Sequence, residues 1–232
     1  MHKVLVSWSS GKDSALALYE VLQGGEYEVS ALLTTVTEAY DRISMHGVRN
    51  VFLEQQAYSL GFPLERVLIS KDASNEEYES RMHRLLSIYQ HAGVRSVAFG
   101  DIFLEDVRNY REGNLAKLGM NGLFPLWKRD THELVRSFIH LGFKAVVTCV
   151  DTNALGRQFV GRHIDEQFLS DLPSGVDPCG ENGEYHSFVY DGPLFRERIR
   201  FTTGEVVLRE NRFAYMDLLP RYEAKEACQG PA

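Results

Sequence analysis

The beginning of the chain contains the feature that most restricts its fold, a strand, a polar turn and a helix in direct succession. Residues 4–6 are apolar and β-prone, residues 9–14 are small or polar, and residues 15–22 are strong helix formers. Such a turn leaves backbone N–H groups unpaired at the start of a helix, where the helix dipole also favours an anion. An ordinary βα turn needs one serine as a cap, whereas this turn has three serines, a glycine and a lysine. The segment therefore predicts a phosphate-binding loop.

The lysine in this turn does not belong to a Walker A motif. That motif has glycine at the position of Val6 and serine or threonine directly after the lysine, where this chain has Asp13. Ser9–Ser14 instead resembles the Ser-Gly-Gly-x-Asp-Ser loop of the N-type ATP pyrophosphatases. The resemblance implies that the loop binds the pyrophosphate half of ATP and that the bond at the α-phosphate is broken. Ser10 replaces the usual first glycine, which is tolerable if this position does not need a positive φ.

Composition restricts the partners and the compartment. The 232 residues are 44% hydrophobic and 25% charged, which is typical of a soluble globular protein with a substantial core. The net charge of −7 and the lack of a basic run argue against a nucleic-acid partner. No apolar run approaches the roughly 20 residues of a membrane span, and the first strand starts too early for a signal peptide. Three cysteines without a C-x-x-C pair favour a cytoplasmic protein without disulfides or structural zinc.

Strand and helix patterns alternate through the first half. We expect strands at 4–6, 28–36, 65–70, 94–99 and 122–127, with helices at 15–22, 51–60, 75–91 and 102–118. This alternation predicts an α/β fold with a parallel, doubly wound sheet. Ligands of such sheets lie outside the carboxyl ends of the strands. The Ser9–Ser14 loop, Thr34, Thr35, Gly100 and Asp101 should therefore share one rim.

The pattern changes after Trp127. Here we expect helices at 131–141 and 159–172, and strands at 144–150, 185–190, 196–201 and 205–209. The sequence thus predicts an ATP-binding domain at 1–128 and a smaller C-terminal α+β lobe at 129–223. Residues 224–232 are expected to be a disordered tail.

A second polar cluster occupies the segment Asp177–Ser187, Asp-Pro-Cys-Gly-Glu-Asn-Gly-Glu-Tyr-His-Ser. Two glutamates three residues apart in a glycine-rich turn can coordinate magnesium or act as a general base. Glu-Asn-Gly is also an ordinary hairpin turn, so the local pattern alone leaves both interpretations open.

Together, the two motifs resemble the diphthine–ammonia ligase-like family of ATP pyrophosphatases, within the adenine nucleotide alpha hydrolase (HUP) superfamily. Members have a Ser-Gly-Gly-Lys-Asp-Ser loop on strand one, a Glu-Gly-Gly-Glu-(Phe/Tyr)-Glu-Thr motif before a later strand, and then Asp-x-Pro-x-Phe. The corresponding segments here are 9–14, 181–187 and 191–195. Met45-His46, Gly156-Arg157 and Gly161-Arg162 with Asp165 also fall where the family has similar residues.

The chain departs from this pattern on the acceptor side. Asn182 stands in place of glycine, and His186 and Ser187 in place of glutamate and threonine. This form of the motif, and the segment Phe99–Asp106, resemble the bacterial branch, and bacteria do not make diphthamide. We therefore expect the reaction class to carry over to an acceptor other than diphthine.

The resemblance implies an amide-forming ligase that adenylates a small-molecule carboxylate, releases pyrophosphate and couples ammonia. ATP and Mg²⁺ are the implied cofactors, and a homodimer is left open. An ATP-dependent tRNA thiolation enzyme is one alternative, but it would need a basic face and paired cysteines. A non-catalytic ATP- or AMP-binding module is another, and it would not need the Glu181–Ser187 turn. The implied catalytic residues are Lys12, Asp13, Glu181 and Glu184, with Asp13 on the metal; the ATP-binding residues are Ser7, Ser9, Ser10, Gly11, Lys12, Asp13, Ser14, Thr34, Thr35, His46, Gly100 and Asp101; the acceptor-side residues are Asn182, Gly183, Tyr185, His186 and Arg162.

Four of the polar residues named so far have a plain structural alternative. His46 could be an ordinary loop residue, and Asp101 could cap the following helix, although its place at the rim favours a function. For Cys179 a structural role is favoured over nucleophilic catalysis. His186 could be catalytic or structural.

Overall fold

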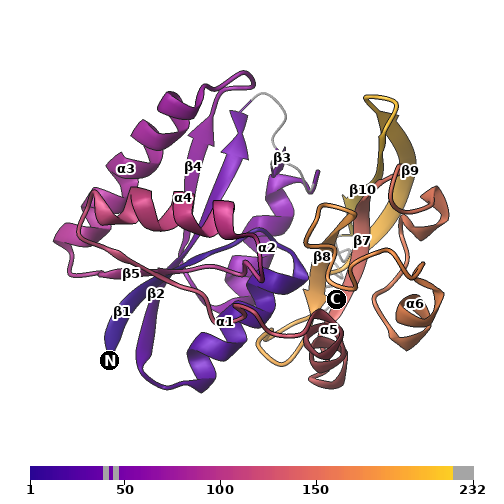
Figure 1. The fold of residues 1–232 in the computed structure, drawn as a ribbon, viewed down its shortest axis with the longest axis horizontal. Helices are drawn as coiled ribbons and strands as arrows, with labels where there is room; N and C mark the ends of the chain where they lie inside the picture. Colours follow the sequence, from indigo (N-terminus) through magenta and orange to yellow (C-terminus); the bar gives the residue numbers. More distant parts are fainter. Residues whose placement is uncertain (39–41, 44–46, 222–232) are drawn as a thin grey trace, which may run out of the picture.

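The computed structural model describes residues 1–38, 42–43 and 47–221. A parallel sheet with helices on both faces stands beside a smaller antiparallel sheet (Figure 1). In chain order, the first part contains β1 (His2–Ser7), α1 (Lys12–Gln23), β2 (Tyr27–Thr37), β3 (Arg42–Ile43), α2 (Asn50–Leu60), β4 (Leu64–Ile69), α3 (Asn75–His91), β5 (Ser96–Ala98), α4 (Glu105–Ala116) and β6 (Asn121–Leu123). The second part contains α5 (Thr131–His140), β7 (Lys144–Asp151), the 3-10 helix η2 (Arg157–Phe159), α6 (Glu166–Asp171), β8 (Tyr185–Asp191), β9 (Phe201–Arg209) and β10 (Phe213–Pro220). Within the described ranges, no helix is both long enough and apolar enough to cross a membrane.

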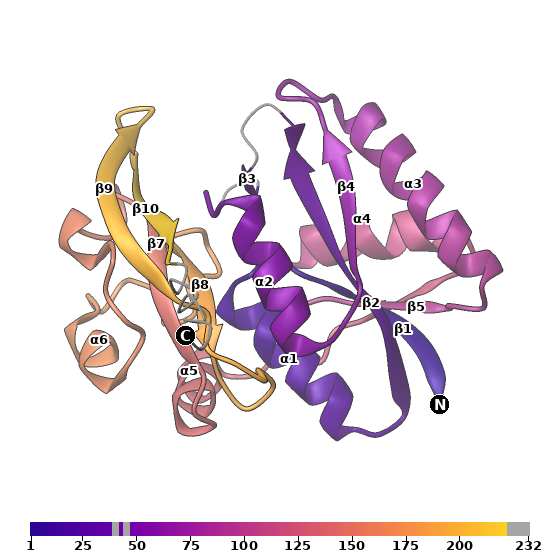
Figure 2. The ribbon, with the colours of Figure 1, turned by 180° about the vertical axis from the view of Figure 1, so that it is seen from behind.

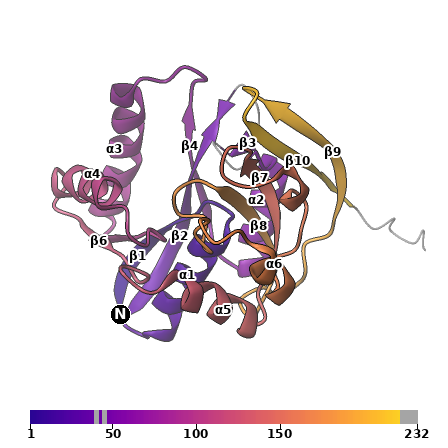
Figure 3. The ribbon, with the colours of Figure 1, turned by 45° about the vertical axis from the view of Figure 1, so that its right-hand side comes forward.

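The strand order of the first sheet creates a switch point between β1 and β5. The parallel strands lie in the order β4-β2-β1-β5-β6, and β3 pairs antiparallel with the end of β2. From β1 the chain proceeds outward to β2 and β4, and then returns to β5 on the other side of β1. Helices α1 and α2 cover one face, whereas α3 and α4 cover the other (Figures 2 and 3). The predicted doubly wound fold is confirmed, and its switch point is where such sheets bind ligands.

Local sequence signals set several helix boundaries. Ser74 caps α3, since its hydroxyl accepts a hydrogen bond from the Glu77 N–H at 3.2 Å. Helix α2 ends at Gly61, which has a left-handed φ of 79°. Both features agree with the boundaries expected from the sequence.

The C-terminal sheet, with the order β8-β7-β10-β9, packs against the layer formed by α1 and α2. One hydrophobic cluster extends through this layer into both sheets, with the rings of Phe52 on α2 and Phe188 on β8 only 5.1 Å apart. A second cluster, which includes Leu5, Val97 and Leu115, fills the opposite face of the first sheet beneath α3 and α4. The phosphate-loop helix α1 is therefore held between the two sheets.

The C-terminal part differs from expectation at three places. The helix expected at 159–172 is the short η2 followed by α6, because the Asp165 carboxylate accepts from the Phe168 N–H at 2.7 Å and starts a new helix. Residues 196–200 form no strand, and β9 begins at Phe201. The hairpin partner β10 was not predicted. Its turn has Glu210 and Asn211 at positive φ, where hairpin turns usually have glycine.

Candidate active site

The Ser9–Ser14 loop leaves the carboxyl end of β1 and leads directly into α1, whose N-cap is Gly11. The Ser14 hydroxyl donates to the Gly11 carbonyl at 2.9 Å, and the Ser9 hydroxyl donates to that of Ser14 at 3.2 Å. Ser10 has a φ of +70°, so the position does use the left-handed conformation that favours glycine. The serine is tolerated here in a fully buried position.

Gly100 allows the end of β5 to approach this loop closely. A β-carbon at this position would lie 2.8 Å from the carbonyl carbon of Asp13 and 3.0 Å from the backbone nitrogen of Ser14. The next residue, Asp101, forms an ion pair with Arg111 of α4, with Oδ2 and Nε 2.8 Å apart. The two loops at the switch point are therefore in backbone contact, as the strand-end rule predicted.

Gly100→Ala is expected to displace the start of α1, because the new methyl group would meet backbone atoms that cannot rotate away. We expect a stability loss of about 1–3 kcal/mol and weaker ATP binding, measured by denaturant unfolding and calorimetric titration. Gly113→Ala in α4 is the matched control. Its methyl group would have open space, so it should stabilise the helix by about 0.5–1 kcal/mol. Unchanged ATP binding in Gly100→Ala would contradict the argument.

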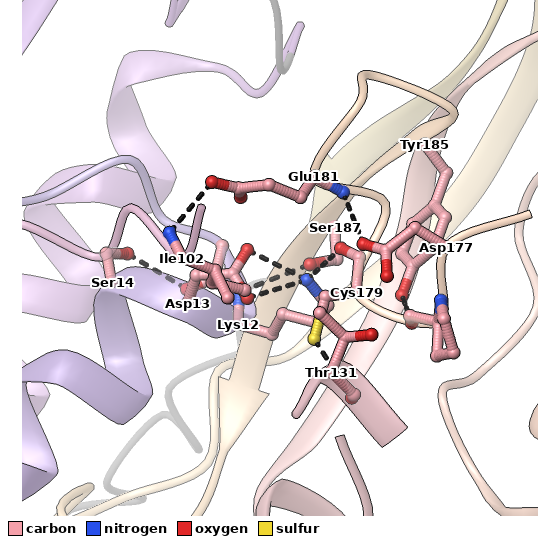
Figure 4. A network of polar contacts seen from close by, with 12 residues as sticks. Lys12, Asp13, Ser14, Ile102, Thr131, Asp177, Cys179, Glu181, Tyr185 and Ser187 are labelled. Atoms are coloured by element: carbon pink, nitrogen blue, oxygen red, sulfur yellow. Dashed lines mark hydrogen bonds and ion pairs between the residues drawn. The ribbon is translucent and has the colours of Figure 1, made fainter. Parts of the chain in front are cut away.

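Lys12 is a buried cation between the two sheets (Figure 4). Its Nζ lies 2.7 and 2.8 Å from the two carboxylate oxygens of Asp13, donates to the Cys179 carbonyl, and stands 5.4 Å from the centre of the Tyr185 ring. Burial, the largest single effect, would lower the pKa of Lys12, but Asp13 together with Tyr185 and Cys179 outweighs it and the pKa is raised. The side chain therefore stays charged and ties the loop to the Asp177–Ser187 turn.

The loop backbone is also bound to β8. The Lys12 N–H donates to the Ser187 hydroxyl at 3.2 Å, and the Val189 N–H donates to the Ser10 carbonyl at 2.9 Å. Gln56 of α2, which is fully buried, donates to the carbonyls of Ser10 and Val189 and accepts from the Trp8 indole at 2.8 Å. Gln56 was not identified from the sequence, because the pattern of an amphipathic helix does not show whether a single glutamine is buried or exposed.

Glu181 and Glu184 lie in the turn at Asp177–Ser187, here named the acceptor turn, and they point in different directions. Glu181 reaches back to the first sheet, where its Oε1 accepts from the Ile102 N–H at 2.8 Å. Burial raises the pKa of Glu181 to about 7; the Ile102 hydrogen bond opposes this rise, and the nearby Asp13 carboxylate adds to it. Near neutral pH, Glu181 can therefore both accept and release a proton.

Glu184 instead holds the turn together from within. Its Oε1 accepts from the Asp177 N–H at 3.1 Å and from the Asn182 amide at 3.0 Å, and the residue is 6% exposed. Two left-handed glycines, Gly180 and Gly183, reverse the chain around it. Glu184 and Asn182 therefore shape the turn that presents Glu181.

Two hollows meet at this site. The first is a cavity of about 450 Å³ between the carboxyl edge of the sheet and helices α3 and α4. The second is a polar cleft of about 260 Å³ between the phosphate loop, the Gly100–Asp101 segment and the acceptor turn. Four residues line both hollows: Ser7, Ser9, Arg111 and His186.

The structure brings most of the candidate residues to these hollows, but not all. The cavity is lined by Thr34 and Thr35, and the cleft by Gly11, Lys12, Asp13, Ser14, Gly100, Asp101, Glu181, Gly183 and Tyr185. Arg162 lies outside both, since it pairs with Asp171 at 2.8 Å and stacks on the rings of Phe159 and Phe168. Ser10, Asn182 and Glu184 support the site from behind. His46 lies outside the described residues.

The donor chemistry of the cleft fits magnesium. In the described ranges, no three or more His, Cys, Asp or Glu side chains gather as a complete metal site. Magnesium bound to a nucleotide needs only one or two carboxylates, because phosphate oxygens and water supply the remaining ligands. Asp13, Asp101 and Glu181 all offer carboxylate oxygens along the cleft.

Neither of the two described cysteines fits sulfur transfer. Cys149 and Cys179 are buried, and burial raises the pKa of Cys179 to about 12. The Cys179 thiol donates to the Thr131 carbonyl at 3.3 Å. The favoured structural role of Cys179 agrees with this environment.

His186 is expected to make stability depend on pH. Burial, with a smaller effect of Lys12, lowers the pKa of His186 from 6.5 to about 4. Between these values the unfolded chain binds the proton and the folded chain does not, so the free energy of unfolding should fall as pH falls from about 6.5 to 4. Denaturant unfolding should show a weaker decline in His186→Gln than in the parent protein. Equal slopes for the two proteins would contradict this assignment.

Comparison with known proteins identifies relatives along most of the chain. Residues 2–122 match the family model for the diphthamide synthase N-terminal domain, and residues 130–218 match the model for the C-terminal domain of the same family. The diphthine–ammonia ligase of Schizosaccharomyces pombe is 28% identical over 224 residues, which cover 88% of this chain and 37% of that protein. The diphthine–ammonia ligase of Homo sapiens is 27% identical over 225 residues (86% and 83%), and that of Danio rerio is 28% identical over 225 residues (88% of each). The chain thus spans little more than a third of the yeast relative and most of the two vertebrate ones.

Proposed function

Because the chain belongs to the diphthamide synthase family, we propose that it is an ATP-dependent ligase that converts a carboxylate into an amide with ammonia. The relatives that bear the name diphthine–ammonia ligase support the reaction class. The acceptor in this proposal is a small-molecule carboxylic acid other than diphthine, because Asn182, His186 and Ser187 stand where the motif of the diphthine–ammonia ligases has glycine, glutamate and threonine.

The observation that carries the proposal is the pair of joined hollows. The cavity of about 450 Å³ has a mainly apolar lining and suits an adenosine group. The cleft beside it contains the start of α1, where backbone N–H groups and the helix dipole favour the β- and γ-phosphates. A nucleotide that fills both hollows has its α-phosphate at the four shared residues.

In the first step, a carboxylate oxygen of the acceptor attacks the α-phosphorus. The bond from this phosphorus to the bridging oxygen breaks, and its electron pair leaves with pyrophosphate. The loop N–H groups and the hydroxyls of Ser9 and Ser14 stabilise the charge that develops there. Asp13 would hold Mg²⁺, which supplies charge neutralisation on the phosphates. Burial raises the pKa of Asp13, and Lys12 opposes this rise and holds the carboxylate in place.

In the second step, ammonia attacks the carbonyl carbon of the acyl-adenylate. The bond from this carbon to the phosphate oxygen breaks, AMP leaves with the electron pair, and the nitrogen loses a proton. Glu181 is the base in this proposal, because its carboxylate lines the cleft and its pKa is raised to about 7.

An exchange assay separates this proposal from its alternatives. Purified protein with Mg²⁺, ATP and labelled pyrophosphate is incubated with individual small carboxylic acids, in the absence of ammonia. We expect acid-dependent incorporation of label into ATP, and AMP release only after ammonium is added. ATP binding without exchange for any acid would favour a nucleotide-binding module. Exchange that depends on tRNA would favour a thiolation enzyme.

A further inference from the structure

Arg111 stands where the two hollows meet. It belongs to α4, which no sequence motif linked to the nucleotide, yet its side chain lines both the cavity and the cleft. Of the other residues that do so, Ser7 and Ser9 are neutral. His186 is neutral near pH 7, because its pKa is lowered to about 4. Arg111 is therefore the permanent cation among these four residues.

We propose that Arg111 binds the α-phosphate of the nucleotide. This assignment rests on the proposed function, which places that phosphate where the hollows join. Lys12, the other cation of the cleft, is already held by Asp13 and the Cys179 carbonyl. Arg111 supplies the charge at the phosphorus whose bonds change, and this charge counts most when negative charge grows on the attacked phosphoryl group.

The surroundings of Arg111 orient its guanidinium group and leave donors for a ligand. Its Nε lies 2.8 Å from Asp101 Oδ2, and one terminal nitrogen donates to Oδ1 at 3.2 Å. The centre of the Phe99 ring lies 4.5 Å from the central carbon of the Arg111 guanidinium group. A guanidinium has five N–H donors, of which the hydrogen bond to Asp101 Oδ1 uses one. Asp101 and Phe99 therefore act as positioning residues for Arg111.

A purely structural role for the ion pair makes a different prediction. If the pair only held α4 against the Gly100–Asp101 segment, removal of either partner would disturb ligand binding to the same extent. If Arg111 is the phosphate ligand, Asp101→Asn should leave AMP binding intact or strengthen it, because the new amide oxygen can still accept the hydrogen bond that positions Arg111 while the competing negative charge is gone. The two roles thus differ in the sign of the Asp101→Asn effect.

The test compares AMP with adenosine, which lacks the phosphate, by calorimetric titration without divalent cations. Arg111→Met should weaken AMP binding by about tenfold or more and change adenosine binding by less than about twofold. Arg111→Lys should lie between Arg111→Met and the parent protein, since it keeps the charge and loses the planar fork. Arg108→Met is the matched control: it lies one turn earlier in α4, packs on Phe124 and Trp127, and lines neither hollow.

The outcomes are distinct. Equal losses for AMP and adenosine in Arg111→Met, or equal losses of AMP binding in Asp101→Asn and Arg111→Met, would overturn the assignment. If Arg111→Met shows no cooperative thermal transition, AMP binding by Arg111→Lys and Asp101→Asn tests the assignment instead. A parent protein that binds AMP through Arg111 but shows no exchange with any acid would refute the ligase and leave this inference standing. A parent protein that binds neither AMP nor adenosine would refute both.

Discussion

Lys12→Met is expected to lower the free energy of unfolding by about 3 kcal/mol. The methionine is close to lysine in size, so the main change is electrostatic. Asp13 loses the cation that faces both of its oxygens, and the Cys179 carbonyl loses its donor. A largely buried carboxylate that loses its partner lowers the free energy of unfolding strongly, whereas the loss of a surface ion pair changes it little.

Denaturant unfolding measures this effect, and Lys117→Met is the control. Lys117 pairs with Glu79 at 3.2 Å, but its side chain is 59% exposed, so its loss should cost less than about 1 kcal/mol. The double variant Lys12→Met/Asp13→Asn should regain part of the lost free energy of unfolding, because it contains no unpaired charge at this position. If Lys12→Met and Lys117→Met have equal effects, Lys12 does not join the two sheets as described.

Glu181→Gln is expected to reduce AMP formation in the presence of ammonia by about 10²–10⁴-fold. The amide keeps the Ile102 hydrogen bond, since its oxygen can still accept, but it cannot take a proton from the attacking nitrogen. Acid-dependent pyrophosphate exchange precedes this step and should stay within a few-fold of the parent rate. At a fixed concentration of free ammonia, AMP formation by the parent protein should rise as pH approaches about 7, where Glu181 loses its proton, and level off above it. Glu181→Gln should lack this rise.

Glu184→Gln makes the same chemical change three residues away and serves as the matched comparison. Glu184 holds Asp177 and Asn182 inside the turn, and its buried Oε2 has no hydrogen-bond partner among the residues that the structure describes. We expect a lower melting temperature in Glu184→Gln. Pyrophosphate exchange and AMP formation should fall by the same factor, and AMP formation should still increase as pH approaches about 7. A selective loss of the ammonia-dependent step in Glu184→Gln, but not in Glu181→Gln, would reverse these roles.

The sequence was informative wherever a function depends on neighbours along the chain. The anion-binding turn after β1, the end of α2 at Gly61 and the convergence of Ser9–Ser14 with Gly100 follow from local patterns and one topological rule. The hairpin of β9 and β10 was missed because its turn lacks the usual glycine.

Residues whose importance comes from distant contacts could not be recognised in this way. Gln56 matters because it lies between the Ser10 and Val189 carbonyls, and Arg111 because α4 brings it to the junction of two hollows. The inward direction of Glu184 and the outward direction of Glu181 depend on the left-handed glycines between and before them. Spacing along the chain predicted neither direction.

The hydrogen bond from the Lys12 N–H to Ser187 joins residues that are 175 positions apart. During synthesis at about 5–20 residues per second, the phosphate loop leaves the ribosome roughly 10–35 seconds before the strand that completes it. The nascent chain therefore has β1 and α1 long before the segment at 177–189 can close over the loop. We expect a ribosome-bound fragment that ends before β8 to retain ATP less well than the full chain, because the Lys12 N–H and the Ser10 carbonyl lack their partners there.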